Sequence, residues 1–256
     1  IFEYMDKKRS IEVVFSPLIF PVIEDTSAVV VIIDVLRATS AICSAFAHGV
    51  EKLIPVETLD EAEEYKQKGY IVAAERDGYV KDFADFGNSP FNFTKERVNG
   101  KEIVYSTTNG TQSIHLAKEF YRIAIGSFLN ISGLAKWIVE QNRNVILLCA
   151  GWKGRFNLED SLMAGALTDK LLCYNSIETN CDAAKAALDL WNMADHDPLD
   201  YINKAAQRER LKEKKLDDVI PFCFTSDYTD IVPVYYNNYL ISDKKIKIKE
   251  SLDLQI

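Results

Sequence analysis

The sequence predicts an α/β fold, namely a three-layer α/β/α domain around a largely parallel or mixed central sheet. Short apolar runs alternate with helical segments along most of the 256 residues, which is the pattern of strand–helix–strand units. The run at 29–34 is a series of Val and Ile without alternation, typical of a strand covered on both faces. Hydrophobic residues make up 48% of the chain. We find no repeat or linker, so residues 1–256 are expected to form a single domain.

The expected strands are short apolar runs bounded by turn residues. They lie at 11–15, 29–34, 53–56, 70–74, 103–106, 121–125 and 145–150, with two late strands at 219–222 and 232–236. The lysine-rich stretch 243–251 is expected to be an exposed edge strand or a frayed tail.

The expected helices follow these strands. They span 38–49, 58–69, 112–120, 132–140, 161–173, 179–192 and 198–212. The first contains small residues and ends at Gly49, a suitable C-cap, and the second ends at Gly69. A charged run at 207–215 in and beyond the last helix is interpreted as a solvated face rather than a binding patch.

Charge and cysteine usage exclude several classes of protein. The formal net charge of −8 disfavours general binding to nucleic acid or to an anionic membrane. The five cysteines are scattered without a CxxC pair, as in a reduced cytoplasmic protein. No window has the length of a membrane span, and the first ten residues lack an apolar signal region. We therefore expect a cytoplasmic protein, for which a homodimer is a common outcome.

Small polar clusters follow four of the expected strands. They are Asp34–Ser40, Glu75–Gly78, Thr107–Thr111 and Gly151–Asp160. If the four strands run parallel, these loops lie along one edge of the sheet, where ligands of open α/β sheets bind. The clusters bring together carboxylates, cations, hydroxyls and glycine-rich backbone, which suits an anion and a metal ion.

Each cluster also has a purely structural interpretation. Asp34 and Thr39 can cap a helix, and the Asn109-Gly110 pair is common in tight turns. Glu159 and Asp160 fall in the first turn of a helix that Asn157 can cap, where acidic side chains are favoured in any protein. The four clusters therefore indicate a binding site only when they are taken together.

The motifs that are missing narrow the chemistry. The chain has neither a GxxxxGK[ST] phosphate loop nor a GxGxxG dinucleotide loop. No DxDx[TV] motif follows the strand at 29–34. The three histidines are isolated, which makes a zinc hydrolase unusual. A carboxylate-rich site without His or Cys ligands suits Mg²⁺, which is often shared with a phosphate.

Four segments together resemble the 2-phosphosulfolactate phosphatase (ComB) family. They are DVLRATS, FGNSP, TTNGT and CAGWKGRFNLED followed four residues later by AG, and the resemblance is sharpest between about Ser16 and Gly165. It implies a Mg²⁺-dependent α/β enzyme that hydrolyses (2R)-phospho-3-sulfolactate to sulfolactate and phosphate in coenzyme M biosynthesis. The positions that match the family pattern are Asp34, Arg37, Thr39, Asn88, Ser89, Thr107, Thr108, Asn109, Gly110, Glu159 and Asp160.

Roles for these residues are assigned from their chemistry. The expected catalytic residues are Asp34, Arg37, Thr39 and Asn109. The expected substrate-binding residues are Ser40, Arg76, Asn88, Ser89, Thr107, Thr108, Gly110, Lys153 and Arg155. The expected Mg²⁺ ligands are Asp34, Glu159 and Asp160. Arg37 and residues 107–110 are placed to clamp the phosphate, while Arg76, Lys153 and Arg155 are candidates for the sulfonate and carboxylate. The nucleophile is a metal-bound water or a carboxylate such as Asp34, and the missing DxDx[TV] context favours water.

Two other functions fit the same residues. One is a broader phosphatase for small anionic phosphorylated 2-hydroxy acids, such as phospholactate or phosphoglycolate, since members of the family also occur where coenzyme M is not made. The other is a non-catalytic protein that binds an anionic metabolite, although a pure anion binder has no use for three carboxylates that face a phosphate.

Overall fold

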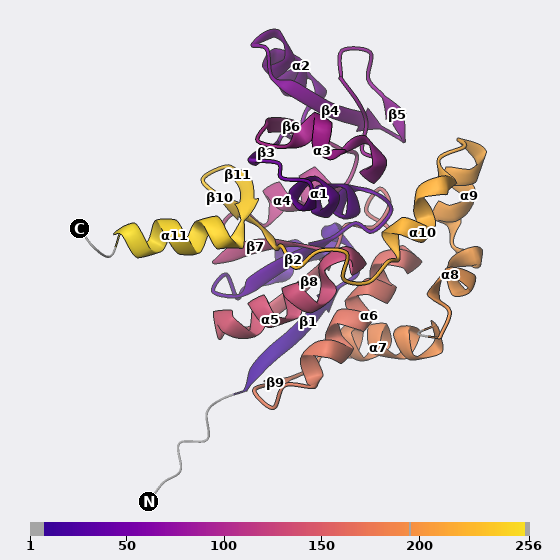
Figure 1. Ribbon diagram of the computed structural model, residues 1–256. Coiled ribbons are helices and arrows are strands. Elements are labelled where there is room, and N and C mark those ends of the chain that lie inside the picture. Colours follow the sequence, from indigo (N-terminus) through magenta and orange to yellow (C-terminus); the bar gives the residue numbers. More distant parts are fainter. Residues whose placement is uncertain (1–7, 195, 254–256) are drawn as a thin grey trace, which may run out of the picture.

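The computed structural model describes residues 8–194 and 196–253. Within them, eleven strands form one mixed sheet flanked by helices (Figure 1). The strands are β1 (Arg9–Val14), β2 (Val29–Ile33), β3 (Lys52–Pro55), β4 (Ile71–Arg76), β5 (Tyr79–Val80), β6 (Glu102–Ser106), β7 (Arg122–Gly126), β8 (Val145–Cys149), β9 (Ile177–Glu178), β10 (Pro233–Tyr236) and β11 (Tyr239–Ser242). The α/β class and the mixed sheet are confirmed.

The helices lie between and after the strands. The α-helices are α1 (Ala38–Ala47), α2 (Leu59–Gln67), α3 (Lys95–Val98), α4 (Gly110–Leu116), α5 (Ile131–Gln141), α6 (Leu158–Leu172), α7 (Asp182–Ala194), α8 (Pro198–Tyr201), α9 (Ala206–Glu213), α10 (Ile220–Cys223) and α11 (Asp243–Asp253). The 3₁₀ helices are η1 (Pro17–Val22), η2 (Pro90–Asn92), η3 (Phe128–Asn130), η4 (Ile202–Lys204) and η5 (Asp217–Val219). No helix of the described chain combines the length and apolar character needed to cross a membrane.

The sheet consists of two parallel groups joined by an antiparallel hairpin. The strand order is β5-β4-β6-β3-β11-β10-β7-β2-β8-β1-β9. Strands β4, β6 and β3 pair in parallel in one group, with β5 antiparallel to β4 at its edge. Strands β7, β2, β8, β1 and β9 pair in parallel in the other group. The β10–β11 hairpin pairs with β3 and with β7 through one residue pair on each side, Leu240 with Leu53 and Val234 with Ala124. The four polar clusters therefore do not follow one continuous parallel sheet.

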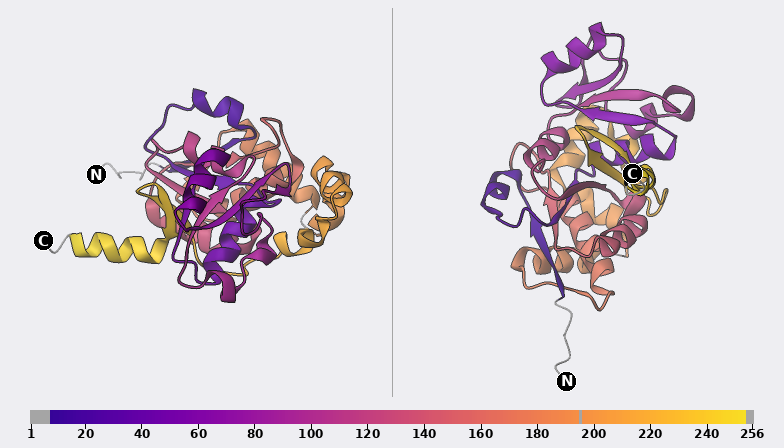
Figure 2. Two further views of the ribbon diagram at one scale, coloured as in Figure 1. Left: turned by 90° about the horizontal axis from the view of Figure 1, so that it is seen from above. Right: turned by 90° about the vertical axis from the view of Figure 1, so that its left-hand side faces the viewer.

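Despite this break, the polar clusters face the same region. In Figure 1 the polar ends of both groups point toward the orange segment that contains α8, α9 and α10, and Figure 2 shows the two groups of strands at a steep angle to one another. Short hairpin contacts and the usual strand twist allow such a turn. The segment from α8 to α10 thus covers the edge at which the clusters lie.

Strand β2 shows why a run without alternation marks the centre of the sheet. All five of its residues are buried. Val29, Val31 and Ile33 pack in one apolar cluster with residues of α5, α6 and α7, whereas Val30 and Ile32 pack in a second cluster with α1 and α4. Because both faces are covered, no polar side chain is tolerated until the strand ends. Asp34 is the first residue beyond it.

Three expectations for the last third of the chain are wrong. Residues 219–222 form the end of η5 and then α10 instead of a strand, which reflects the ambiguity of short apolar runs. The helix expected over 198–212 is divided into α8, η4 and α9, because Ala205 is extended with ψ of 132°. Residues 243–251 belong to α11 rather than to an edge strand or frayed tail; Asp243 and Val232 exchange hydrogen bonds where β11 ends and the helix begins.

Candidate active site

The turn after β2 is held by its own hydroxyl groups. Thr39 Oγ1 accepts a hydrogen bond from the Asp34 N–H at 3.1 Å, and the Thr39 N–H donates to the Asp34 carbonyl at 2.9 Å. Ser40 Oγ donates to the Val35 carbonyl at 2.9 Å. The Leu36–Arg37 peptide bond is cis. Thr39 and Ser40 thus shape the turn, while Asp34 and Arg37 line the cavity described next.

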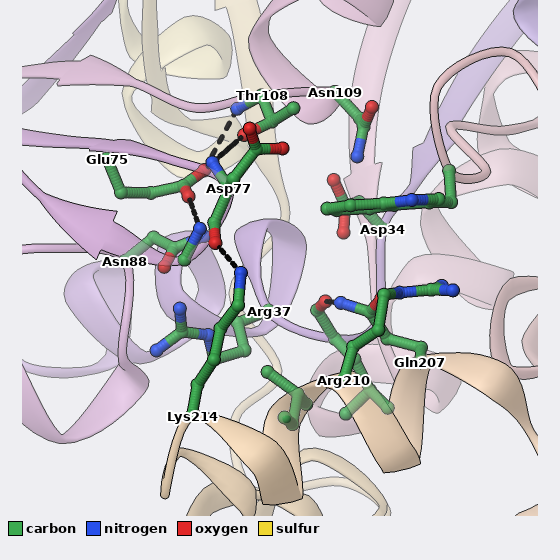
Figure 3. A pocket seen from close by; sticks show the side chains of 14 residues that line it. Asp34, Arg37, Glu75, Asp77, Asn88, Thr108, Asn109, Gln207, Arg210 and Lys214 are labelled. Carbon is green, nitrogen blue, oxygen red and sulfur yellow. Dashed lines mark hydrogen bonds between the residues drawn. The ribbon is translucent and has the colours of Figure 1, made fainter.

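A small polar cavity lies between the strand-end loops and α9 (Figure 3). We call it the first pocket; its volume is about 30 Å³. It is lined by Asp34, Leu36, Arg37, Glu75, Asp77, Gly78, Asn88, Thr108, Asn109, Trp152, Gln207, Arg210, Leu211 and Lys214. Of the residues expected at the site, it brings together Asp34, Arg37, Asn88, Thr108 and Asn109.

Glu75 fastens the loop after β4 to the loop after β6. Its side chain is 4% exposed and accepts hydrogen bonds from the Gly78 N–H at 2.6 Å, the Thr108 N–H at 2.9 Å and Thr108 Oγ1 at 3.1 Å. The Thr108 N–H is therefore used within the protein, and so is the Thr107 N–H, which donates to Thr111 Oγ1 at 3.2 Å. Glu75, which the sequence indicated only as part of a weak turn motif, fixes one side of the pocket.

Gly110 permits the loop after β6 to approach Asp34. A Cβ atom at this position would lie 3.1 Å from Asp34 Oδ2 and 2.8 Å from Ala38 Cβ. Real Cβ atoms essentially never come closer than 3.0 Å to another heavy atom, so a larger residue would displace the carboxylate or α1. The TTNGT motif therefore includes glycine for close approach to the turn after β2.

Asp160 ties the loop after β2 to the loop after β8. Its carboxylate is fully buried and accepts hydrogen bonds from the Val35 N–H at 2.8 Å, the Gly151 N–H at 3.0 Å and Asn157 Nδ2 at 2.8 Å. Neighbouring Glu159 is 2% exposed, and its Oε1 accepts from Asn157 Nδ2 at 3.1 Å. Both acids lie in the first turn of α6, as expected, but neither lines the first pocket.

Helix α9 closes the first pocket from the opposite side. Gln207 and Arg210 of α9, and Lys214 directly after it, point toward the strand-end loops (Figure 3). Gln207 Nε2 donates to the Leu36 carbonyl at 3.3 Å, and Arg210 Nε donates to Gln207 Oε1 at 2.7 Å. Lys214 Nζ donates to the Asp77 carbonyl. The interpretation of 207–215 as only a solvated face is wrong. Its spacing of three or four residues between Gln207, Arg210 and Lys214 was a signal of one helical face.

Several expected substrate-binding residues lie elsewhere. Arg76 donates to the Glu57 and Glu75 carbonyls and to Ser106 Oγ, at 2.7–2.9 Å, and Ser89 precedes η2. Thr107 contributes to its own loop. Lys153 forms an exposed ion pair with Asp77 at 2.9 Å. Arg155 lines a different pocket, considered below.

Comparison with known proteins identifies the family. The family profile described as 2-phosphosulpholactate phosphatase matches residues 21–238. The chain belongs to this family. The match includes β2, the strand-end loops and α9, and therefore both sides of the first pocket.

Relatives of the chain carry a consistent description. A probable 2-phosphosulfolactate phosphatase of Thermotoga maritima is 37% identical over 211 residues, covering 82% of this chain and 90% of the relative. One from Caldanaerobacter subterraneus subsp. tengcongensis is 34% identical over 212 residues, covering 81% and 88%. One from Clostridium botulinum is 31% identical over 217 residues, covering 83% and 91%.

The buried acids of this family member destabilise one another when ionised. Burial, followed by the charges of Asp160 and Glu75, raises the pKa of Asp34 well above its usual range. Burial, together with the charge of Asp34, raises the pKa of Glu159 to about 7. Burial, together with the charge of Glu159, raises the pKa of Asp160 to about 8. A cation near these groups would offset this repulsion.

The expected set of three carboxylate ligands is not assembled. Among the described residues, no group of three acidic, His or Cys side chains is arranged to hold a metal ion. The two oxygens of Asp160 already accept three hydrogen bonds. The first pocket offers the Asp34 carboxylate, and also Asn88 Oδ1, a buried oxygen that has no hydrogen-bond partner in the described chain. These oxygens fit a Mg²⁺ ion of the kind that is held by one or two protein groups, substrate phosphate and water.

Proposed function

We propose that the protein hydrolyses the phosphate monoester of (2R)-phospho-3-sulfolactate to 3-sulfolactate and phosphate, in a Mg²⁺-dependent reaction of coenzyme M biosynthesis. Family membership supports the reaction class. The single structural observation that carries the proposal is the first pocket, in which the buried carboxylate of Asp34 is surrounded by Arg37, Arg210 and Lys214. A phosphate ester with further anionic groups needs this concentration of positive charge in a protein of net charge −8.

The cations of the first pocket bind and orient the phosphate. Arg37 is 5% exposed, and a desolvated guanidinium forms strong paired hydrogen bonds with phosphate oxygens. Arg210 and Lys214 add charge from the opposite side, so that the phosphoryl group is held between α9 and the turn after β2. Such positioning supplies much of the rate acceleration in phosphoryl transfer.

Asp34 and Asn109 act on the reacting water. Asp34 accepts a proton from water as the water oxygen attacks phosphorus. The bond between phosphorus and the ester oxygen breaks, and that oxygen takes up a proton from solvent water to become the hydroxyl of the product. Asn109 lines the same pocket and orients the water. A Mg²⁺ ion bound at Asp34 would stabilise the charge that develops on the phosphoryl oxygens.

The proposed function is tested by phosphate release. Racemic 2-phospho-3-sulfolactate and phospholactate are each incubated with the protein, with Mg²⁺ or with EDTA. We expect release of about half of the phosphate of the sulfolactate ester, because one enantiomer is used, and only with Mg²⁺. No release from either ester by folded protein with Mg²⁺ would overturn the proposal and favour a binding protein.

A broader substrate range is the second candidate. It is favoured by the position of Lys153, which was expected from the sequence to bind the sulfonate or carboxylate but does not line the first pocket. In that case phospholactate would be hydrolysed as fast as the sulfolactate ester, which would keep the chemistry and replace the substrate.

A further inference from the structure

A second pocket adjoins the first on the other side of one wall. Trp152, Gln207 and Arg210 line both cavities and form this wall. Arg210 is held there by its hydrogen bond to Gln207 and by a cation–π contact with Trp152. The guanidinium carbon lies 4.6 Å from the centre of the Trp152 ring. The second pocket has a volume of about 480 Å³, whereas the first has only about 30 Å³. The second pocket therefore has room for an organic ligand.

The polar groups of the second pocket define its ligand. Three cations line it: Arg155, Lys204 and Arg210. Glu159 also lines it, 2% exposed, and its Oε2 atom has no hydrogen-bond partner in the described part of the chain. Asn157 Oδ1 also lines the second pocket and has no hydrogen-bond partner among the described residues. A ligand that satisfies all of these groups carries anionic groups for the cations and at least one donor hydrogen for the two oxygens.

An anionic 2-hydroxy acid has this combination. We propose that the second pocket binds the dephosphorylated 2-hydroxy acid product, with its carboxylate and sulfonate at Arg155, Lys204 and Arg210 and its hydroxyl donating to Glu159 Oε2. This inference rests on the proposed function. The ester oxygen of the substrate has no hydrogen to donate, whereas the product hydroxyl does, so the pocket distinguishes product from substrate. The phosphate product stays on the other side of the wall, in the first pocket.

Binding measurements test this assignment without turnover. Calorimetry follows 3-sulfolactate, lactate and inorganic phosphate binding to the full chain. We expect 3-sulfolactate to bind in the presence of saturating phosphate, and lactate to bind at least roughly tenfold more weakly because it lacks the sulfonate. The double variant Arg155→Ala/Lys204→Ala should weaken 3-sulfolactate binding by roughly ten- to a hundredfold and leave phosphate binding unchanged.

Arg208→Ala is the matched control. Arg208 lies on α9, carries the same charge as Arg210 and lines neither pocket, so its removal should leave both affinities unchanged. Mutual exclusion of 3-sulfolactate and phosphate, or equal 3-sulfolactate affinity in the double variant and the wild type, would overturn the assignment. A protein that hydrolyses the ester but shows this exclusion would refute only the second pocket. A protein that binds 3-sulfolactate beside phosphate but hydrolyses no ester would refute only the proposed function.

Discussion

The two sides of the first pocket differ in how firmly they are built. On the strand side, Asp34, Glu75 and Asp160 are at most 7% exposed, and Glu75 and Asp160 bind backbone N–H groups of neighbouring loops. On the opposite side, α9 has only Gln207 and Leu211 among its buried residues. From this difference we expect a division of roles, in which the strand side fixes the geometry of the reaction and α9 brings charge to the substrate. Each prediction below tests that division.

The largest effect is expected on the strand side, at Asp34. Asp34→Asn keeps the shape of the side chain but removes its charge and its ability to accept a proton. We expect the rate of phosphate release to fall by roughly 100- to 10,000-fold, as for loss of a general base. Circular dichroism should show an unchanged fold. A variant that retains more than roughly a tenth of the rate would remove Asp34 from the mechanism.

The second prediction concerns stability, which the buried acids of the strand side make dependent on pH. The folded-state pKa values of Glu159 (about 7) and Asp160 (about 8) lie above their usual values of 4.5 and 3.8, so the folded state binds more protons than the unfolded state between these limits. The free energy of unfolding should therefore fall as the pH rises from about 5 to about 8.

Urea denaturation with EDTA at several pH values measures this slope. In the Glu159→Gln variant, the loss of the free energy of unfolding between about pH 5 and about pH 8 should be smaller by on the order of 3 kcal/mol. Mg²⁺ should raise the stability of the wild type most at the alkaline end of this range. Stability that rises with pH over this range would show that the acids are stabilised in their ionised forms.

The third prediction concerns α9 and is expected to be smaller. Arg210→Ala and Lys214→Ala each remove one cation from the first pocket. We expect KM for the ester to rise by roughly ten- to a hundredfold in each variant with a smaller change in kcat, because a charged contact contributes about 1.5–3 kcal/mol.

Arg208→Ala and Lys212→Ala provide the matched comparison, since both residues lie on α9 but line neither pocket. If all four variants behave alike, the effect comes from the overall charge of α9 and not from its inner face.

The smallest effect is expected at Lys153. Its amine pairs with Asp77 at 2.9 Å, but both side chains are about half exposed, and such pairs contribute at most about 1 kcal/mol. Lys153→Ala should therefore change kcat/KM by no more than roughly fivefold. A loss of roughly a hundredfold would return Lys153 to the substrate contacts inferred from the sequence.

Local pattern was sufficient for much of the strand side. The buried run of β2 and the positive-φ glycines of the loop after β8, Gly151 and Gly154, are features of neighbouring residues, and each imposes a local requirement that few other structures meet. Asp34, Arg37, Asn88, Thr108 and Asn109 were predicted at the site and line the first pocket. The sequence could not show whether Arg76 binds a ligand or the protein itself. Only the folded chain shows that its guanidinium donates to the carbonyls of Glu57 and Glu75.

The sequence by itself determined the α/β class, the central strand and the strand-end polar clusters, because these depend on hydrophobic period and on residues close together in the chain. The tertiary structure decided which clusters meet, how the β10–β11 hairpin divides the sheet, and that α9 covers the pocket. Arg210 lies 173 positions after Arg37 in the chain, yet both line the first pocket. The local sequence is the same whether a charged side chain points into solvent or lines a pocket. Only the packing between distant segments of the chain decides between the two.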